Sequence, residues 1–581
     1  MKFRSFVFLS AVACVRMLAA GTSCVLVADG DASGAKGRMQ VHSVVTNGVE
    51  VRWFEEMVPM RDGVRLYTVG LLPPVGEKRP IIFEKTPYDN AQRLPDAFAW
   101  AWKNRETLER GYAPVHQQAR GTDRSEGACL VYENERRDGL DALEWIRRLP
   151  HYNGEIFLYG ASYCASVHWS YLDTDPPDIK GAWLSVQDVN RYNIHYRNGN
   201  FKIALHGAWS DIMHKKNDRT LRRDSSVRFT DLPLKGYTVR KFGEYVPGLE
   251  ASWEHPRPAD PWWRTDGAAG GEYRRALLDT HMPVVLTTGF YDIYTEGIFD
   301  MWRELPSARR ANCALVVDEG DHVTRHPDID SSCSWFDHCR GAKNALRLVR
   351  PGRTTWREVW GDGWRSAEEM TDGELARTFS LGADRSLSEG SVQDGEVAFA
   401  YDPSHPPAFS PVGCLTFGGL GVQPGPDWAT GVVSFVSAPF DTACHVQGRM
   451  RLRLAVKSDC DDTAFYVRIN VWRNDEGRWY NLRDDIKTIC WDHPDYSPGT
   501  EVDVDYLLSD HAFAIRPGDR IRVDVAGASP AQFVPHTNFR GPFHEQSKSR
   551  IARNTILAGR SRLVLPIGVG ERDKKERRRC P

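Results

Sequence analysis

The sequence predicts an α/β domain followed by an all-β domain, and three observations carry that prediction. Between about 40 and 350, short apolar runs that end in polar loops alternate with helix-like segments, which is how a parallel sheet is built. From about 370, apolar and polar residues alternate with a period of two, which is typical of antiparallel strands. The 581-residue length exceeds that of one ordinary hydrophobic core, so we expect two or three domains.

The chain begins with a pattern that resembles an export signal. "MKFR" is cationic, "SFVFLSAVACV" is apolar, and "LAAG" offers small residues for cleavage near Ala20 or Gly21. We therefore expect residues 1–21 to be a signal peptide and the protein to be exported, either periplasmic or secreted. The apolar run is too short to span a membrane, and no later segment is long and apolar enough.

Composition and charge exclude several classes of partner. The formal net charge of -2 gives no basic surplus for nucleic acid, and the locally basic end over 569–581 mixes both signs, so we expect a disordered tail. The twelve cysteines include no C-x-x-C pair and no zinc-type spacing, so a metal site is not expected. We also expect no other cofactor. The sequence leaves the oligomeric state open, a homodimer included.

The α/β region alternates strands and helices in a clear order. "RPIIFEKTPY" predicts a buried strand, and "ERRDGLDALEWIRRLP" a helix that Pro150 closes, with Leu140, Leu143, Ile146 and Leu149 on one side. "GEIFLYG" predicts the next strand and "SYCASVHWSYL" the next helix. "MPVVLTTGFYD" and "CALVVDEGDH" predict two further strands that end in polar residues. Function is then expected at the carboxyl ends of these strands.

A long insertion separates the helix "SYCASVHWSYL" from the strand "MPVVLTTGFYD". We expect the α/β domain over 45–185 and 281–365, a helical cap over 186–280, and a β jelly roll over 370–568. The cap is rich in tryptophan, and these side chains either line a binding site or pack within the insertion. They are Trp209, Trp253, Trp262 and Trp263.

The stretch "YGASYCAS" lies between a predicted strand and a predicted helix and resembles the nucleophile-elbow pattern G-x-S-x-G. A sharp turn at Gly160 would present the Ser162 hydroxyl at a helix N-terminus and direct the Tyr163 N–H at a developing oxyanion. The last glycine of the pattern is missing, and we assign Ala165 to its position. By itself, the stretch leaves a nucleophile and an ordinary loop serine equally open.

A serine nucleophile needs a base and an acid that orients the base. In folds with this elbow, the chain order is nucleophile, acid, base. Asp292 ends "TTGFYD" and His322 ends "LVVDEGDH", both at predicted strand ends. Taken singly, an aspartate in the place of Asp292 is more often a helix cap, and a histidine in the place of His322 is more often a surface residue. Glu319, Asp321 and His326 are rival candidates, but order and strand-end placement together favour Asp292 and His322.

Several segments resemble one family of hydrolases. "MRDGVRL", "KTPYDN", "ARGTDRSEG", "ERRDGLDALEW", "GASYCA" and "GFYD" fall in the order seen in the CocE/NonD hydrolases. That group includes cocaine-esterase-type enzymes, α-amino-acid ester hydrolases, cephalosporin acylases and the X-Pro dipeptidyl-peptidases of the S15 type. "WFDHCRGAKN", "YDPSHPP" and the strand-rich end resemble the family's later segments, so the resemblance covers about residues 45–568.

The resemblance implies an α/β-hydrolase domain, a helical cap and a C-terminal jelly roll. It implies Ser162 as nucleophile, Asp292 as acid and His322 as base. It also implies an oxyanion hole formed by the Tyr88 hydroxyl and the Tyr163 N–H. Two departures stand out, because Ala165 replaces the family's last elbow glycine and "DEGDH" replaces a "GPW"-like turn before the base.

These residues predict a serine hydrolase that cleaves carboxylic esters, and amides as a further option, through an acyl-enzyme. The substrate is a small-molecule ester or acyl compound. In members of this family that accept a free α-amino group, part of a carboxylate cluster directly follows the acid. Here Ile293, Tyr294 and Thr295 follow Asp292, with Glu296 later, so the resemblance argues against such a substrate. The alternatives are an X-Pro dipeptidyl-peptidase or acylase of the same family, and a non-catalytic protein that binds a partner through the jelly roll.

Overall fold

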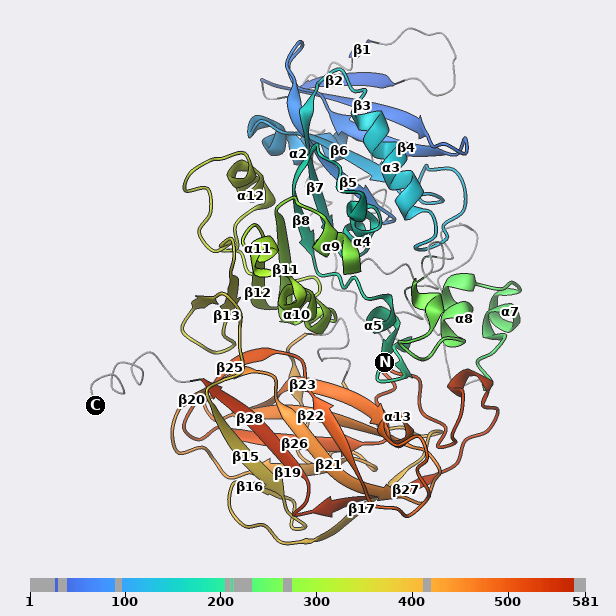
Figure 1. Cartoon of the computed structure of the whole chain (residues 1–581), viewed down its shortest axis with the longest axis vertical. Coiled ribbons are helices and arrows are strands. Elements are labelled where there is room, and N and C mark those ends of the chain that lie inside the picture. Colours follow the sequence, from blue (N-terminus) through green and yellow to red (C-terminus); the bar gives the residue numbers. More distant parts are fainter. Residues whose placement is uncertain are drawn as a thin grey trace, which may run out of the picture.

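The computed structural model describes residues 27–29, 39–46, 48–88, 97–203, 209, 213, 232–264, 274–410 and 419–568. The expected signal peptide and the expected C-terminal tail lie outside these ranges. An α/β domain forms the upper half of Figure 1, a β domain forms the lower half, and short helices lie between them at the right. None of the described helices is long and apolar enough to cross a membrane.

One mixed sheet forms the centre of the α/β domain. Its strands, in spatial order, are β1 (Val27–Asp29), β2 (Gln40–Thr46), β3 (Val49–Pro59), β4 (Arg65–Leu71), β6 (Ala113–Gln118), β5 (Arg79–Thr86), β7 (Tyr152–Ala161), β8 (Ile179–Ser185), β11 (Val284–Tyr291), β12 (Ala314–Asp321), β13 (Thr354–Arg357) and β14 (Trp364–Ala367). The run from β6 to β13 is parallel. The carboxyl ends of β5, β7, β11 and β12 therefore meet at one edge of the sheet.

Helices cover both faces of this sheet. They are α2 (Ala97–Glu109), α3 (Glu135–Ile146), α4 (Tyr163–Trp169), η2 (Leu172–Thr174), α9 (Arg274–Asp279), α10 (Thr295–Glu304), α11 (Ser307–Arg310) and α12 (Ser332–Cys339). Along β5 the side chains alternate, so Phe83 joins the core beneath α3 while Ile82 joins the cluster beneath α12. In α3, Leu143 and Ile146 are fully buried, as the apolar pattern predicts.

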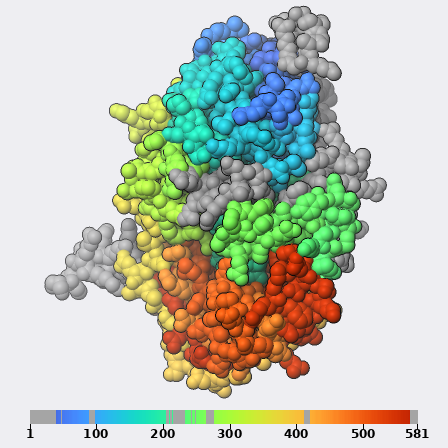
Figure 2. Space-filling model, turned by 45° about the vertical axis from the view of Figure 1, so that its right-hand side comes forward, coloured from blue at the N-terminus to red at the C-terminus, as the bar shows by residue number. Residues whose placement is uncertain are grey.

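The described part of the insertion contains short helices and one hairpin. Its elements are α5 (Arg191–His195), β9 (Tyr196–Arg197), β10 (Asn200–Phe201), α7 (Tyr237–Phe242), α8 (Pro247–Trp253) and η5 (Pro261–Arg264). They form a separate hydrophobic cluster that contains Trp253 and Trp263. In Figure 2, the insertion lies between the α/β domain and the β domain. The insertion is thus placed at the junction of the two larger domains.

The C-terminal domain consists mainly of antiparallel strands, as predicted. They are β15 (Leu375–Leu381), β16 (Ser386–Ser388), β17 (Gly395–Tyr401), β18 (Val422–Gln423), β19 (Val433–Ser437), β20 (Cys444–Gly448), β21 (Arg451–Ser458), β22 (Ala464–Arg473), β23 (Arg478–Thr488), β24 (Val502–Leu507), β25 (His511–Ile515), β26 (Arg520–Ala526), β27 (Ala552–Ala558) and β28 (Arg562–Gly568), with the short helices α13 (Ile489–Asp492) and η6 (Phe543–Glu545). The period-two segments "RLRLAVKS" and "AFYVRINVW" form β21 and β22.

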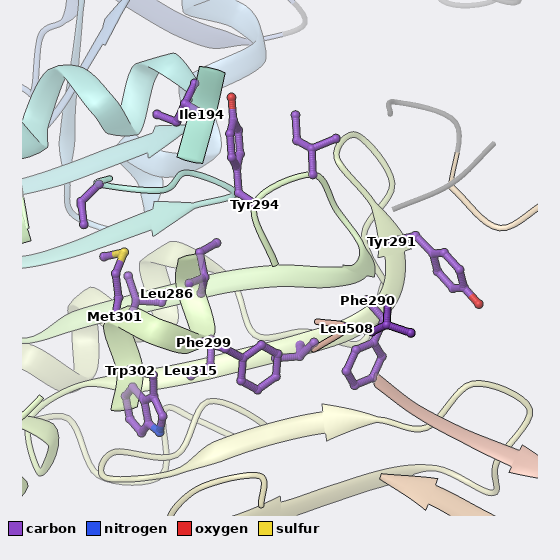
Figure 3. Packing of buried hydrophobic residues seen from close by; sticks show 14 of the residues in the cluster. Ile194, Leu286, Phe290, Tyr291, Tyr294, Phe299, Met301, Trp302, Leu315 and Leu508 are labelled. Atoms are coloured by element: carbon purple, nitrogen blue, oxygen red, sulfur yellow. The ribbon is translucent and has the colours of Figure 1, made fainter. Parts of the chain in front are cut away.

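The α/β and β domains share one hydrophobic core. A single cluster of buried residues includes Phe290 and Phe299 from β11 and α10 together with Leu508, which follows β24. Figure 3 shows the Phe290 ring beside Leu508 at this junction. Because apolar surface is removed from water on both sides, the β domain is fixed against the end of β11. This contact lies directly before Asp292.

Candidate active site

Ser162 occupies a strained turn between β7 and α4. Its backbone dihedrals are φ 57° and ψ -130°, a region that a non-glycine residue adopts only when the surroundings impose it. The surroundings do so here, because the Ser162 N–H donates to the carbonyl of Ser185 at 2.9 Å. The Ser162 carbonyl in turn accepts from the N–H groups of Ala165 and Ser166 in the first turn of α4. The turn therefore holds the hydroxyl at the edge of the sheet.

The glycine requirement of this turn corrects one sequence assignment. Counted from Gly160, the fifth position of G-x-S-x-G is Cys164, and Ala165 follows it. A Cβ on Gly160 would lie 2.5 Å from the carbonyl oxygen of Cys164, so glycine is needed at the first position. Cys164 fits because its thiol points to the Thr86 hydroxyl at 3.3 Å. Ala165 is fully buried in the core without disturbing the turn.

Ser162, His322 and Asp292 lie together, as the sequence predicts. His322 Nε2 is 2.9 Å from Ser162 Oγ, and His322 Nδ1 is 3.1 Å from Asp292 Oδ2. The Asp292 side chain is buried, and its other oxygen accepts from the Tyr294 N–H at 2.7 Å. The Arg325 guanidinium lies 3.7 Å from the same carboxylate. Arg325 was missed from sequence, since it lies in an irregular loop after the predicted base.

The rival acids and base have other partners. Glu319 accepts from Arg357 at 3.2 Å, and Asp321 accepts from the Val323 N–H at 2.9 Å. The His326 ring packs edge-to-face against the Trp364 ring, and its Nδ1 accepts a hydrogen bond from the Asp328 N–H. Asp321 therefore holds the loop that follows His322, whereas Glu319 is paired with β13.

The two predicted oxyanion donors lie beside Ser162. The Tyr88 side chain is hydrogen-bonded to Ser162 and to Trp209. Burial raises the pKa of Tyr88 above its ordinary value, so its hydroxyl remains a neutral donor. The Tyr163 N–H is the first of α4 and has no acceptor inside the helix. Both groups thus lie next to the serine.

A buried polar network anchors the Tyr163 side chain. Its hydroxyl donates to Glu135 Oε1 at 2.8 Å and accepts from the Tyr132 N–H at 2.7 Å. Burial raises the pKa of Glu135, and the nearby ammonium of Lys85 opposes that rise. Glu135 lies in the segment "ERRDGLDALEW", which the sequence predicts as a helix. The apolar pattern of that helix does not indicate that Glu135 contacts Tyr163.

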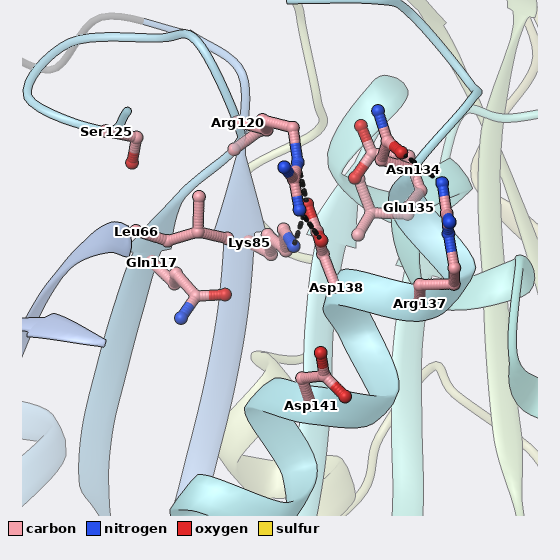
Figure 4. Close-up of polar contacts among 12 residues, drawn as sticks. Leu66, Lys85, Gln117, Arg120, Ser125, Asn134, Glu135, Arg137, Asp138 and Asp141 are labelled. Carbon is pink, nitrogen blue, oxygen red and sulfur yellow. Dashed lines mark hydrogen bonds and ion pairs between the residues drawn. The ribbon is translucent and has the colours of Figure 1, made fainter. Parts of the chain in front are cut away.

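Helix α3, which carries Glu135, also contacts the sheet through a second carboxylate, that of Asp138. Asp138 of α3 accepts from Arg120 at 2.7 Å and lies 3.9 Å from the fully buried Lys85 ammonium. Figure 4 shows the Arg120 and Lys85 side chains converging on Asp138, with Glu135 one turn away on α3. Since breaking a buried charge network is costly, α3 and the side chain of Tyr163 are held in one arrangement.

A cavity of about 880 Å³ opens at Ser162. Tyr132, Trp209 and Tyr294 line it near the serine. Of the four cap tryptophans, Trp209 alone is among the described lining residues. Trp253 and Trp263 are buried in the cluster of the insertion, so packing is the correct interpretation for them. Trp262 stacks on His255.

Comparison with known proteins places the chain in a family. A model described as "X-Pro dipeptidyl-peptidase (S15 family)" matches residues 62–324, and one described as "X-Pro dipeptidyl-peptidase C-terminal non-catalytic domain" matches 348–563. Cocaine esterase of Rhodococcus sp. (strain MB1 Bresler) is 25% identical, over 88% of this chain and 97% of its own. This chain belongs to the CocE/NonD family of hydrolases.

Solved structures agree with this family fold. An α-amino acid ester hydrolase superposes with a TM-score of 0.73 at 17% identity, over 89% of this chain and 96% of its own. A CocE/NonD family hydrolase of Staphylococcus aureus superposes with a TM-score of 0.62 at 17% identity, over 97% of this chain and 99% of its own. The family contains serine esterases and X-Pro peptidase-type hydrolases, so this CocE/NonD protein is an enzyme of that hydrolase class.

Proposed function

We propose that this CocE/NonD protein is a serine carboxylic-ester hydrolase with Ser162 as nucleophile, His322 as base and Asp292 as acid. One observation carries the proposal: His322 lies within hydrogen-bond distance of both Ser162 Oγ, at 2.9 Å, and Asp292 Oδ2, at 3.1 Å. This is the geometry that activates a serine hydroxyl, because Nε2 accepts its proton while the carboxylate holds Nδ1–H.

The reaction proceeds in two acyl-transfer steps. Ser162 Oγ attacks the ester carbonyl as His322 takes its proton, and the alcohol leaves with that proton. Water then gives a proton to His322 and attacks the acyl-enzyme; His322 returns that proton to Ser162 Oγ as the acyl–oxygen bond breaks and the acid leaves. In both steps the Tyr88 hydroxyl and the Tyr163 N–H stabilise the oxyanion. A neutral phenol suits this role because it donates without adding a buried charge.

An ester substrate is favoured over an amine-terminated peptide by the residues that follow the acid. Ile293 and Tyr294 are buried, and the Thr295 hydroxyl donates to the Gly289 carbonyl at 2.6 Å. None of the three presents a carboxylate that would hold a substrate ammonium. A peptidase of the same family remains the second candidate, because the matching family models describe X-Pro dipeptidyl-peptidases.

Labelling with a fluorophosphonate tests the proposal. We expect the parent protein to label and Ser162→Ala to lose both the label and hydrolysis of p-nitrophenyl acetate. Ser170→Ala, a buried serine at the end of α4, is the matched control and should label as the parent does. Labelling of Ser162→Ala at the parent level would contradict the proposal. Faster turnover of a Gly-Pro anilide than of the ester would instead favour the peptidase.

A further inference from the structure

The cavity at Ser162 extends well beyond the reacting atoms. A second part of it, here called the arm, is lined by Glu84 of β5, Tyr159 of β7, Trp100 and Asn104 of α2, and Cys333 of α12. Glu84 lies in β5 and Tyr88 follows two residues after the end of that strand, so the arm reaches up to about 13 Å from the oxyanion donor. It runs across the face of the sheet between α2 and α12.

The arm is lined with hydrogen-bonding groups that face the cavity. Glu84 Oε2 pairs with His116 Nδ1 at 3.0 Å, which leaves Oε1 for a ligand. Among the residues that the structure describes, none bonds to the Tyr159 hydroxyl or to Asn104 Oδ1. The Trp100 ring lies beside that of His116, with centroids 5.9 Å apart, and adds an aromatic surface. Glu84, Tyr159 and Asn104 are half-buried, and half-buried polar groups that line a cavity favour a ligand that supplies their missing partners.

The charges of the arm favour an uncharged ligand. Burial acts to raise the pKa of Glu84, but the hydrogen bond with His116 and the charges of His116 and Lys103 hold it below its ordinary value. Glu84 is therefore a carboxylate, and the exposed Lys103 also lines the cavity. The opposite charges of Glu84 and Lys103 offset each other. A hydroxyl-rich group satisfies acceptors and donors alike without bringing a charge of its own.

The arm lies on the side of the leaving group. His322 protonates the alcohol as it departs, so the alcohol must lie on the side of His322. Val323, which follows His322, lines the same cavity as Cys333 of the arm. Tyr132 and Trp209 belong instead to a separate aromatic cluster around Tyr163, which suits an acyl group.

We propose that the arm binds the alcohol part of the ester and that this alcohol is a neutral polyol, such as a sugar. The inference rests on the proposed function, since it needs ester cleavage at Ser162. Glu84, Tyr159 and Asn104 hydrogen-bond the hydroxyl groups, and Trp100 packs against the carbon skeleton. A site built to bond hydroxyls discriminates strongly against an analogue that lacks them.

A matched pair of acetate esters tests the inference. 6-O-Acetylglucose and cyclohexylmethyl acetate share the acyl group and a six-membered ring but differ in the hydroxyls. We expect kcat/KM for the sugar ester to exceed that for the apolar ester by about tenfold or more. Tyr159→Phe should lower this ratio about fivefold, as removal of one hydrogen bond does, and Glu84→Gln should lower it further. Tyr245→Phe, at an exposed tyrosine of the insertion, is the control and should leave the ratio unchanged.

A second measurement keeps the test independent of variant folding. Free glucose should inhibit p-nitrophenyl acetate hydrolysis by the parent protein competitively, and cyclohexanemethanol should inhibit more weakly. The inference would be overturned if the parent protein's kcat/KM for the sugar ester did not exceed that for the apolar ester. It would also be overturned if Tyr159→Phe folded and left the ratio of these two constants unchanged. If Ser162→Ala abolishes turnover of both esters in that case, the arm assignment alone fails. If Ser162→Ala retains turnover, the proposed function fails as well.

Discussion

The serine and the Asp292–His322 pair are held in place by different means. Ser162 is held locally, by the turn after β7, the first turn of α4 and a buried network that lies within the α/β domain. Asp292 follows a strand whose end is clamped from the other domain. The Phe290 carbonyl accepts from Arg483 of β23, and the Tyr291 hydroxyl donates to the Asn481 carbonyl at 3.3 Å. The position of the nucleophile is thus a local property, while that of the acid depends on the β domain.

Gly160→Ala should disrupt the local positioning of Ser162 and have the largest effect of the substitutions considered. The added Cβ would lie 2.5 Å from the Cys164 carbonyl oxygen, and backbone cannot yield as a flexible side chain does. We expect p-nitrophenyl ester hydrolysis to fall by a factor of about 100 or more, because misplacement by about 1 Å has that effect. Gly425→Ala is the control, since nothing lies within 4 Å of its Cβ. Parent-level activity of a folded Gly160→Ala protein would show that the turn is less constrained than its contacts indicate.

Arg483→Met tests whether the position of Asp292 depends on contacts with the β domain. Arg483 is buried and donates to the carbonyls of Phe290, Ser509 and Asp510. Methionine keeps much of the length but leaves three carbonyls without this donor, so we expect unfolding free energy to drop by about 2–4 kcal/mol. We also expect kcat to fall about tenfold, because the end of β11 is released. Denaturant unfolding and ester kinetics measure both effects.

Arg478→Met is the matched control for that change. Arg478 lies on the same strand, β23, but is exposed. It should leave both stability and kcat near the parent values. If Arg483→Met lowers stability while kcat stays at the parent value, the clamp is structural only, and Asp292 is positioned without help from the β domain.

Tyr163→Phe sharpens the comparison with a smaller effect. The change removes the hydroxyl that joins Glu135 to the Tyr132 N–H while keeping the ring. We expect kcat to fall severalfold, up to about tenfold, with little change in KM, because the Tyr163 N–H is less firmly aimed at the oxyanion. Steady-state kinetics separate the two constants. An increase in KM at constant kcat would instead place Tyr163 in substrate binding.

Much of the fold and of the candidate site follows from sequence patterns. The strands "RPIIFEKTPY" and "GEIFLYG", the helix after Ser162 and the period-two strands of the C-terminal half form as predicted. Each depends on side-chain periodicity within about ten residues. The placement of Ala165 in the elbow pattern was wrong by one residue, because the tight turn is counted from Gly160 and reaches Cys164.

The contacts that aim the site do not follow from such patterns. Glu135 and Lys85 belong to an ordinary amphipathic helix and an ordinary strand, and nothing local indicates that Tyr163 and Asp138 are their neighbours. Arg483 and the Phe290 carbonyl are 193 residues apart. A charged residue such as Arg483 in a predicted strand is equally compatible with a solvent-exposed face of the sheet. The sequence therefore gives no reason to place Arg483 in the interface between the two domains.

The sequence by itself determined which residues this protein brings to the carboxyl edge of its sheet. Strand periodicity and the glycine before the turn are properties of short segments, and local sterics fix them. The order of Ser162, Asp292 and His322 is read directly from the chain. Only the tertiary structure decided the distances among those residues, the network beneath Tyr163 and the clamp on β11. Those depend on which distant groups share a low-dielectric interior, where partners are chosen by packing of the whole chain.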